Sequence, residues 1–239
     1  MNATPINPKQ EGSNVCDAIP QAGPCPIGCN QCFYNRPGAF FSDISKPLMP
    51  TLEEVGDKIV RVNSGNDSNN ARDAVIAATA HYPERFFNTS RPHLGFPAPV
   101  VLTANPREED AVSFLVPSDI DGSMTGLMFV RLRVPTTNIS IIDLAVRLWT
   151  EHGFPIVLTF MRYYDAEPAD NDGRYVFKKS IINDYWCPTR EFMASVLALY
   201  VDNPLVTMCG TLDSGYCRDC RNCETYYWQA KKRMLLAEG

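Results

Sequence analysis

Apolar runs and helical periodicities alternate along most of this chain of 239 residues. The short, continuous apolar runs are typical of strands buried in a parallel sheet, and the segments between them repeat apolar residues at helical spacing. The predicted strands cover 14–19, 60–64, 100–103, 126–134, 155–160 and 205–208. The predicted helices cover 71–82, 143–152, 189–200 and 224–237. Six strands that alternate with helices predict an α/β fold of parallel βα units.

Capping residues and turn-forming segments set the expected boundaries. Thr51 and Thr189 are good N-caps for helices that follow them. After Thr51, one helical face that runs toward a strand is predicted at Leu52, Val55, Ile59 and Val62. The proline-rich segment 83–99 is expected to be a connection. Segment 162–186 interrupts the alternation and is expected to form a hairpin over one mouth of the fold.

Composition indicates a location and removes several functional classes. Hydrophobic residues make up 45% of the chain and charged residues 21%, which suits a sizeable core. No apolar run approaches the ~18 residues of a membrane-spanning helix, so no membrane partner is expected. The net charge is −5 and basic residues do not cluster beyond 231–233, so nucleic-acid binding is unsupported. The polar first residues lack a signal-peptide pattern, and in a cytoplasmic protein nine cysteines indicate metal binding rather than disulfides.

Three cysteines, Cys25, Cys29 and Cys32, lie within eight residues in the spacing C-x3-C-x2-C. Three thiolates on one short loop can converge on a single metal centre. A four-iron cluster bound by three cysteines keeps one iron without a protein ligand, and an open iron is available for chemistry. Disulfides in a secreted protein and a zinc site with a remote fourth ligand are the alternatives. The candidates for that remote zinc ligand are His81, His93 and Cys16.

The cysteine spacing, its early position and the aromatic pair Phe33-Tyr34 just after it resemble the radical S-adenosylmethionine (SAM) superfamily. That family usually has an aromatic residue just before the third cysteine, where this chain has Gln31. The resemblance implies a catalytic [4Fe-4S] cluster on Cys25, Cys29 and Cys32, whose open iron chelates SAM and whose electron cleaves it to a 5'-deoxyadenosyl radical. It implies an electron donor such as a flavodoxin or ferredoxin. It favours a partial (β/α)6 barrel, whereas the alternation alone also allows a doubly wound sheet.

Polar residues at the ends of predicted strands are candidates for the SAM pocket. The second strand of radical SAM enzymes usually ends in a Gly-Gly-Glu-like motif that receives the amino group of SAM, and here Gly65-Asn66-Asp67 occupies that place. The glycine permits close backbone approach, and Asp67 supplies the acid. A helix-capping turn without a ligand explains the same residues. Asn105 is a weaker candidate, because it follows the strand 100–103.

Two arginines share one face of the predicted strand 126–134. Alternation predicts an apolar face and a second face with Leu127, Phe129, Arg131 and Arg133. The apolar face suits packing under helices, so the arginines are expected to point into the barrel, where an unpaired charge is costly. A SAM carboxylate would satisfy one of them. An internal ion pair with an acid such as Asp119 or Asp121 is the alternative.

A second cysteine cluster lies in the tail, at Cys209, Cys217, Cys220 and Cys223. Four thiolates are a full ligand set for one centre, and both a second [4Fe-4S] cluster and a structural zinc fit the C-x2-C steps. Many radical SAM enzymes carry an auxiliary cluster in a C-terminal extension, which this tail resembles. We therefore predict a radical SAM-like barrel over 1–208 and a metal-binding tail with a closing helix over 209–239. Cys16 and Cys187 are interpreted as buried thiols.

The resemblance predicts an enzyme without naming its substrate. The auxiliary-cluster-like tail favours modification of a peptide or protein, and segment 162–186 together with the tail is expected to form the substrate surface. The competing interpretation is a non-catalytic protein held together by two zinc sites. A two-cluster electron carrier is disfavoured by the large α/β core. No H-x3-H spacing, G-x-S-x-G elbow or P-loop occurs, so zinc hydrolases, serine hydrolases and P-loop enzymes are unsupported.

Overall fold

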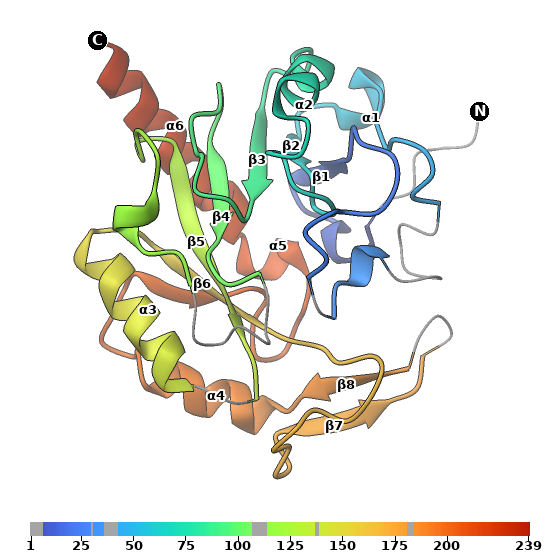
Figure 1. The fold of residues 1–239 in the computed structure, drawn as a ribbon, viewed down its shortest axis with the longest axis vertical. Helices are drawn as coiled ribbons and strands as arrows, with labels where there is room; N and C mark the ends of the chain where they lie inside the picture. The colour runs from blue at the N-terminus through green and yellow to red at the C-terminus, as the bar shows by residue number, and fades with distance from the viewer. Residues whose placement is uncertain (1–6, 30, 36–42, 107–113, 137–138, 181–183) are drawn as a thin grey trace.

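A parallel sheet forms the centre of the computed structural model, which describes residues 7–29, 31–35, 43–106, 114–136, 139–180 and 184–239. The sheet has seven strands in the order β1-β2-β3-β4-β5-β6-β9 and curls into half a barrel (Figure 1). The strands are β1 (Val15–Ala18), β2 (Ile59–Val62), β3 (Arg85–Thr89), β4 (Val100–Thr103), β5 (Leu127–Val134), β6 (Ile156–Phe160) and β9 (Val206–Met208). All neighbours are parallel and lie in chain order without reversal, so the curled sheet is not doubly wound. The predicted α/β class of parallel units is confirmed.

Helices and a separate hairpin surround this sheet. The α-helices are α1 (Leu52–Val55), α2 (Arg72–Thr79), α3 (Ile139–Glu151), α4 (Arg190–Ala198), α5 (Cys217–Cys220) and α6 (Asn222–Glu238). The short 3-10 helices are η1 (Pro8–Gln10), η2 (Phe33–Asn35) and η3 (Pro117–Asp119). Strands β7 (Tyr175–Lys178) and β8 (Tyr185–Pro188) pair antiparallel, which confirms the predicted hairpin. Both predicted N-caps are confirmed: Thr51 accepts a hydrogen bond from the Glu54 amide and Thr189 from the Phe192 amide.

Two predicted elements differ from the structure. Strand β3 lies inside segment 83–99, which was expected to be a connection, so the sheet has seven strands rather than six. Its aromatic pair Phe86 and Phe87 is fully buried, one ring on each face of the sheet, and this burial outweighs the flanking prolines. The helix after Thr51 is a single turn, because Gly56 leaves it with φ 54° and residues 59–62 pair with β1 and β3.

Helices α2, α3 and α4 cover one face of the sheet. Strand residues such as Leu102 and Leu132 pack there against Val75 of α2, Trp149 of α3 and Phe192 of α4. All five side chains are buried. At about 25 cal/mol per Å² of apolar surface removed from water, this burial is the main stabilising contribution on this face. The face is the outer, convex one.

Helix α6 covers the inner, concave face and crosses behind β4 and β5 in Figure 1. Tyr226, Tyr227 and Ala230 are its buried contact residues. The strand residues that they meet are Val15, Ile59, Phe86, Val101, Met128, Phe129 and Val157. Most of these lie in the amino-terminal halves of their strands, so α6 covers the amino-terminal end of the half-barrel.

A β-bulge changes the predicted facing at the start of β5. Leu127 pairs with Val100 and Phe129 with Val101, so Met128 is the extra residue between them. Leu127 consequently packs on the convex side and Met128 on the concave side, the reverse of the predicted alternation for these two. From Phe129 onward the predicted alternation holds.

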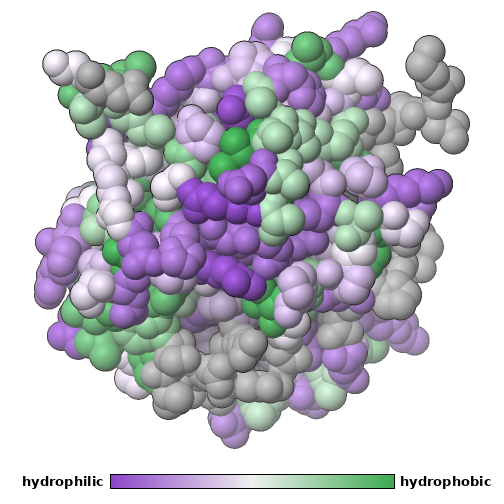
Figure 2. Space-filling model, turned by 45° about the horizontal axis from the view of Figure 1, so that its top comes forward, coloured by the Kyte–Doolittle hydropathy of each residue, from purple (hydrophilic) through white to green (hydrophobic). Residues whose placement is uncertain are grey.

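The surface carries polar residues in a continuous band. Figure 2 shows this band across one face, with smaller hydrophobic areas beside it rather than one large patch. The most exposed large apolar side chains are Leu199, Val201, Leu235 and Leu236. In the ranges that the structure describes, no helix is long and apolar enough to cross a membrane.

Glu84 attaches α6 to the start of β3, and its pKa makes this attachment pH-dependent. Its carboxylate accepts hydrogen bonds from Tyr227 Oη at 2.5 Å and from Lys231 Nζ at 2.5 and 2.6 Å. Burial opposes ionisation, but these bonds outweigh it and lower the pKa of Glu84. A lowered folded pKa contributes stability that is present above the unfolded pKa of about 4.3 and is lost as pH falls through the folded value.

Glu84→Gln is therefore expected to lower the free energy of unfolding by about 1 kcal/mol at neutral pH, since the pair is about a third exposed and screened. Urea unfolding should show that this difference from the unaltered protein shrinks below about pH 4. Glu151→Gln, at an exposed glutamate, is the control and should change little. A Glu84→Gln deficit that stays constant down to acid pH would contradict this account.

Candidate metal centres and cofactor site

Cys25, Cys29 and Cys32 lie on the loop after β1, at the edge where the parallel strands end. All three side chains are partly buried. Burial, followed by repulsion from Cys32, raises the pKa of Cys29 to about 11. Burial, followed by repulsion from the Asp67 carboxylate and then from Cys32, raises the pKa of Cys25. The thiols are thus close enough to influence one another. Without a cation, Cys25 and Cys29 favour the protonated form, and a bound metal would displace those protons.

The three proposed remote zinc ligands have other contacts. The ring of His81 lies 4.0 Å from that of Tyr82, and His93 Nδ1 lies 2.6 Å from a carboxylate oxygen of Asp121. Cys16 packs with the convex-side core. The structure therefore gives no support to a zinc site that joins these residues to the first loop.

The aromatic residue after the third cysteine packs against the glycine of the next strand end. Tyr34 is buried, and its hydroxyl donates a hydrogen bond to the Gly23 carbonyl at 3.2 Å. A Cβ atom on Gly65 would lie only 2.1 Å from the Tyr34 ring. Gly65 is therefore needed for close approach of the cysteine loop to the end of β2. The two motifs that the sequence separates by some 30 residues form one site.

Asp67 lies at this junction but faces inward. Its two carboxylate oxygens accept four hydrogen bonds, from the backbone amides of Asn69 and Ser90 and from the hydroxyls of Thr89 and Ser90, at 2.6–2.9 Å. The residue is only 3% exposed. Four donors occupy the lone pairs of a carboxylate, so no acceptor remains for a ligand amino group. The structure thus favours a structural role for Asp67, joining the end of β2 to the end of β3, over the predicted contact with SAM.

The same turn does not cap the following helix. The N-cap of α2 is Ala71, which makes no side-chain capping bond. Asn66 has φ 66° and its Oδ1 accepts hydrogen bonds from the Asp67 amide and from Asn70 Nδ2 at 2.9 and 3.1 Å. Asn70 Nδ2 also lies 3.7 Å from Cys25 Sγ. The amides of Asn66 and Asn70 are therefore among the polar groups beside the cysteine loop.

Gln31 occupies the position where the resembled family has an aromatic residue. Its Oε1 accepts a hydrogen bond from the Tyr164 amide at 2.9 Å, and its Nε2 donates to Asp165 at 3.4 Å. Tyr164 and Asp165 lie near the start of segment 162–186, the excursion that follows β6. Gln31 thus connects the cysteine loop directly to the segment that carries the hairpin.

Asn105 and Arg133 form a connected pair at the ends of β4 and β5. Asn105 accepts from the Arg133 amide at 2.7 Å and donates to the Arg133 carbonyl at 2.8 Å, so its amide is used by the backbone of β5. The Arg133 side chain donates to Met161 Sδ at 2.9 Å and to the carbonyl of Pro106. Its charge acts on Cys29 and favours the thiolate there. Arg133 therefore belongs to the first cysteine site.

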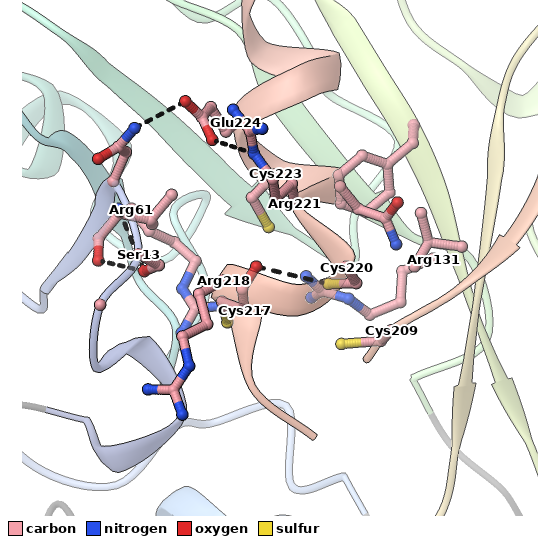
Figure 3. Close-up of a pocket in the computed structure, with 16 residues that line it drawn as sticks. Ser13, Arg61, Arg131, Cys209, Cys217, Arg218, Cys220, Arg221, Cys223 and Glu224 are labelled. Carbon is pink, nitrogen blue, oxygen red and sulfur yellow. Dashed lines mark hydrogen bonds and ion pairs between the residues drawn. The ribbon is translucent and has the colours of Figure 1, made fainter. Parts of the chain in front are cut away.

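The four tail cysteines line a single cavity of about 290 Å³ on the concave face (Figure 3). The cavity also has residues from the segment before β1, from β2, β5 and β6, and from the start of α6. Burial raises the pKa of Cys223 to about 12 and also raises that of Cys217. In the described ranges, no three Cys, His, Asp or Glu side chains form a group that could hold a metal ion as they stand. The structure thus gathers these four thiols around one space without closing a ligand sphere.

Four arginines also line this cavity, and three of them have carboxylate partners. Arg61 pairs with Asp17 at 2.7 Å, Arg221 with Glu224 at 3.1 Å, and Arg218 lies within 4 Å of carboxylates of Glu11 and Asp219. The fourth is Arg131, which reaches in from β5 (Figure 3). The predicted inward direction of the arginines is correct, but Arg131 lies with the tail cysteines rather than at the first loop.

The alternative interpretation, an ion pair of Arg131 or Arg133 with Asp119 or Asp121, does not occur among these described residues. Asp119 accepts from the Val116 amide at 2.8 Å, and Asp121 pairs with His93. Asp17 and Arg61 form the internal pair instead, with two hydrogen bonds of 2.7 and 3.2 Å. A sequence signal was available, because each of these charged residues interrupts an apolar strand.

Comparisons with protein-family models, curated proteins and solved structures found no match for this chain. The functional argument therefore depends on the residues and their geometry.

Gly65→Ala is expected to destabilise the protein by about 1–3 kcal/mol, because the added methyl group overlaps the buried Tyr34 ring. Gly215→Ala is the matched control, since a Cβ there has nothing within 4 Å. Thermal unfolding measures both variants. Equal stability of the two would show that the cysteine loop can shift away from β2.

Asp67→Asn is expected to lower the free energy of unfolding by about 2–3 kcal/mol, because the new NH2 group would face donors where an acceptor is required. Asn66→Asp, one position earlier, is the control, because it keeps the acceptor oxygen that Asn66 supplies and should cost less. Denaturant unfolding is the measurement. If Asp67→Asn were as stable as the unaltered protein, the structural role of Asp67 would be wrong and Asp67 would again be a candidate contact of SAM.

Proposed function

We propose that this protein is a radical SAM enzyme, with a [4Fe-4S] cluster on Cys25, Cys29 and Cys32. The observation that carries the proposal is the position of the C-x3-C-x2-C loop at the carboxyl-end edge of a curled parallel sheet, packed against the end of the second strand. Active sites of parallel α/β folds lie at that edge. The loop supplies three thiols and no carboxylate, a donor set suited to iron–sulfur ligation.

Residues around the loop provide groups of the kinds that SAM requires. The bound cluster would supply the electron that cleaves SAM. Asn66 and Asn70 offer amide groups beside Cys25. Arg133, whose charge acts on Cys29, is a cation of the kind that a carboxylate requires. Gly65 keeps the second strand end close to the loop, and Gln31 fixes the loop to the excursion.

The tail supports a second centre, which we propose to be an auxiliary [4Fe-4S] cluster on Cys209, Cys217, Cys220 and Cys223. Four thiols line one cavity there, and four arginines surround it. Zinc fits the same four thiols. We place the protein in the cytosol, where thiols stay reduced, with a flavodoxin or ferredoxin as electron donor.

A peptide or protein is the proposed substrate. The hairpin next to the cysteine loop exposes Val176 and Phe177, and Arg162 stacks 4.8 Å from the ring centre of Tyr185. Apolar and aromatic side chains held by a hairpin suit contact with an extended chain. Gln31 would carry movement of that surface to the cluster loop.

Anaerobic purification with iron and sulfide reconstitution tests the proposal. Two four-iron clusters predict about eight iron atoms per chain. Alanine at Cys25, Cys29 and Cys32 should halve the iron and abolish formation of 5'-deoxyadenosine from SAM. Alanine at the four tail cysteines should also halve the iron but leave part of that SAM cleavage. Cys187→Ala, a cysteine of β8 outside both groups, should change neither quantity.

A colourless protein that contains zinc and no iron or sulfide would overturn the proposal in favour of a non-catalytic zinc protein. Tail variants that keep all their iron would limit the cluster to the first loop.

A further inference from the structure

Arg131 differs from the other three arginines of the tail cavity. Its closest side-chain acceptors are Asn88 Oδ1 and Thr103 Oγ1, both at the long distance of 3.5 Å. Among the described residues, no carboxylate lies within ion-pair distance of its guanidinium group. The residue is partly buried, and its Cζ atom lies 5.9 Å from the centre of the Phe129 ring. A guanidinium in this position lacks the compensation that its neighbours have.

The tail cysteines, once ionised, are the groups that would stabilise the charge of Arg131. Cys209, Cys223 and Cys217 are the residues whose negative charge would stabilise it. A neutral thiol provides no such charge, whereas a thiolate bound to a metal does. Zn²⁺ with four thiolates and an oxidised [4Fe-4S] cluster with four thiolates both carry a net charge of about −2.

We propose that Arg131 is the counter-cation of a dianionic four-thiolate metal centre in this cavity, with Arg61 already neutralised by Asp17. The inference deepens the proposed function, because it rests on the tail centre and not on the first loop. Loading the site converts four thiols into a dianionic centre and releases four protons. A fixed positive charge beside the thiols favours the loaded form, so loss of that charge weakens metal binding.

The experiment uses the full chain with Cys25, Cys29 and Cys32 replaced by alanine, so that only the tail binds metal. Co²⁺ is the probe, because thiolate coordination gives it an intense absorption band, and a competing chelator yields the dissociation constant. Arg131→Gln is expected to weaken Co²⁺ binding at least about tenfold at neutral pH, in line with the interaction of close charges at a protein interior. Arg131→Lys keeps the charge and should stay within about threefold of the parent.

Arg85→Gln is the matched control. Arg85 lies on β3, is partly buried and donates to the Tyr82 carbonyl at 2.6 Å, outside the cavity. The Arg85→Gln substitution removes one positive charge, as Arg131→Gln does, but it should leave the Co²⁺ affinity unchanged. Circular dichroism confirms that each variant is folded, and rescue by Arg131→Lys separates the charge from a packing effect.

The inference is overturned if Arg131→Gln binds Co²⁺ as tightly as the parent, or if Arg85→Gln weakens binding equally. It is also overturned if the parent shows no thiolate–Co²⁺ band, since the tail would then hold no centre to balance. If the Co²⁺ results are as expected but the unaltered, reconstituted protein does not cleave SAM reductively, the proposed enzyme is rejected. Arg131 would then balance the charge of a structural zinc site.

Discussion

The ion pair between Asp17 and Arg61 is the interaction on which the concave side of the sheet depends. It joins the neighbouring strands β1 and β2 on the inner face of the sheet, with both side chains almost withdrawn from water. Asp17 also accepts hydrogen bonds from Asn7 and Gln10, so the segment before β1 is held on the same carboxylate. Removing either partner would leave an uncompensated charge where burial is costly, and the floor of the tail cavity would lose its shape.

Along β1 and β5, successive inward-facing residues lie first against α6, then beside the tail cavity, and then toward the first cysteine loop. On β1, Val15 meets α6 and Asp17 forms the ion pair, and just after β1 Ile19 packs with the first cysteine loop. On β5, Phe129 and Arg131 follow the same order, one against α6 and one at the tail cysteines. Arg133 then continues toward Cys29. Because successive inward residues of a strand lie about 7 Å apart, the two cysteine groups lie on neighbouring levels of one half-barrel.

The sequence predicted the parts of this arrangement that depend on local periodicity. Strand alternation placed Arg131 and Arg133 on the inner face, and the capping rules located Thr51 and Thr189. The bulge at Met128 was not predictable, because it depends on the register that β5 adopts against β4. Strand β3 was missed because two buried phenylalanines outweigh prolines only once their neighbours are known.

The candidate site was predictable in its residue types but not in its contacts. The cysteine spacings identified both thiol groups. Nothing in the sequence indicated that Asp67 would accept hydrogen bonds from residues at the end of β3, or that Gln31 would contact segment 162–186. Such contacts between distant segments depend on the curl of the sheet, which no short motif specifies.

The hydrogen bond from Asn14 to Glu224 spans 210 positions of sequence and joins the segment before β1 to α6. Contacts between residues far apart in the sequence form only after a large loss of loop-closure entropy, so topologies rich in such contacts fold slowly. The sheet can form against its outer helices first, with its inner wall still open to water. During that interval the tail thiols are accessible to oxidants and to foreign metal ions. If the tail binds the metal that we propose, the order of closure and metal delivery would decide which ion is bound.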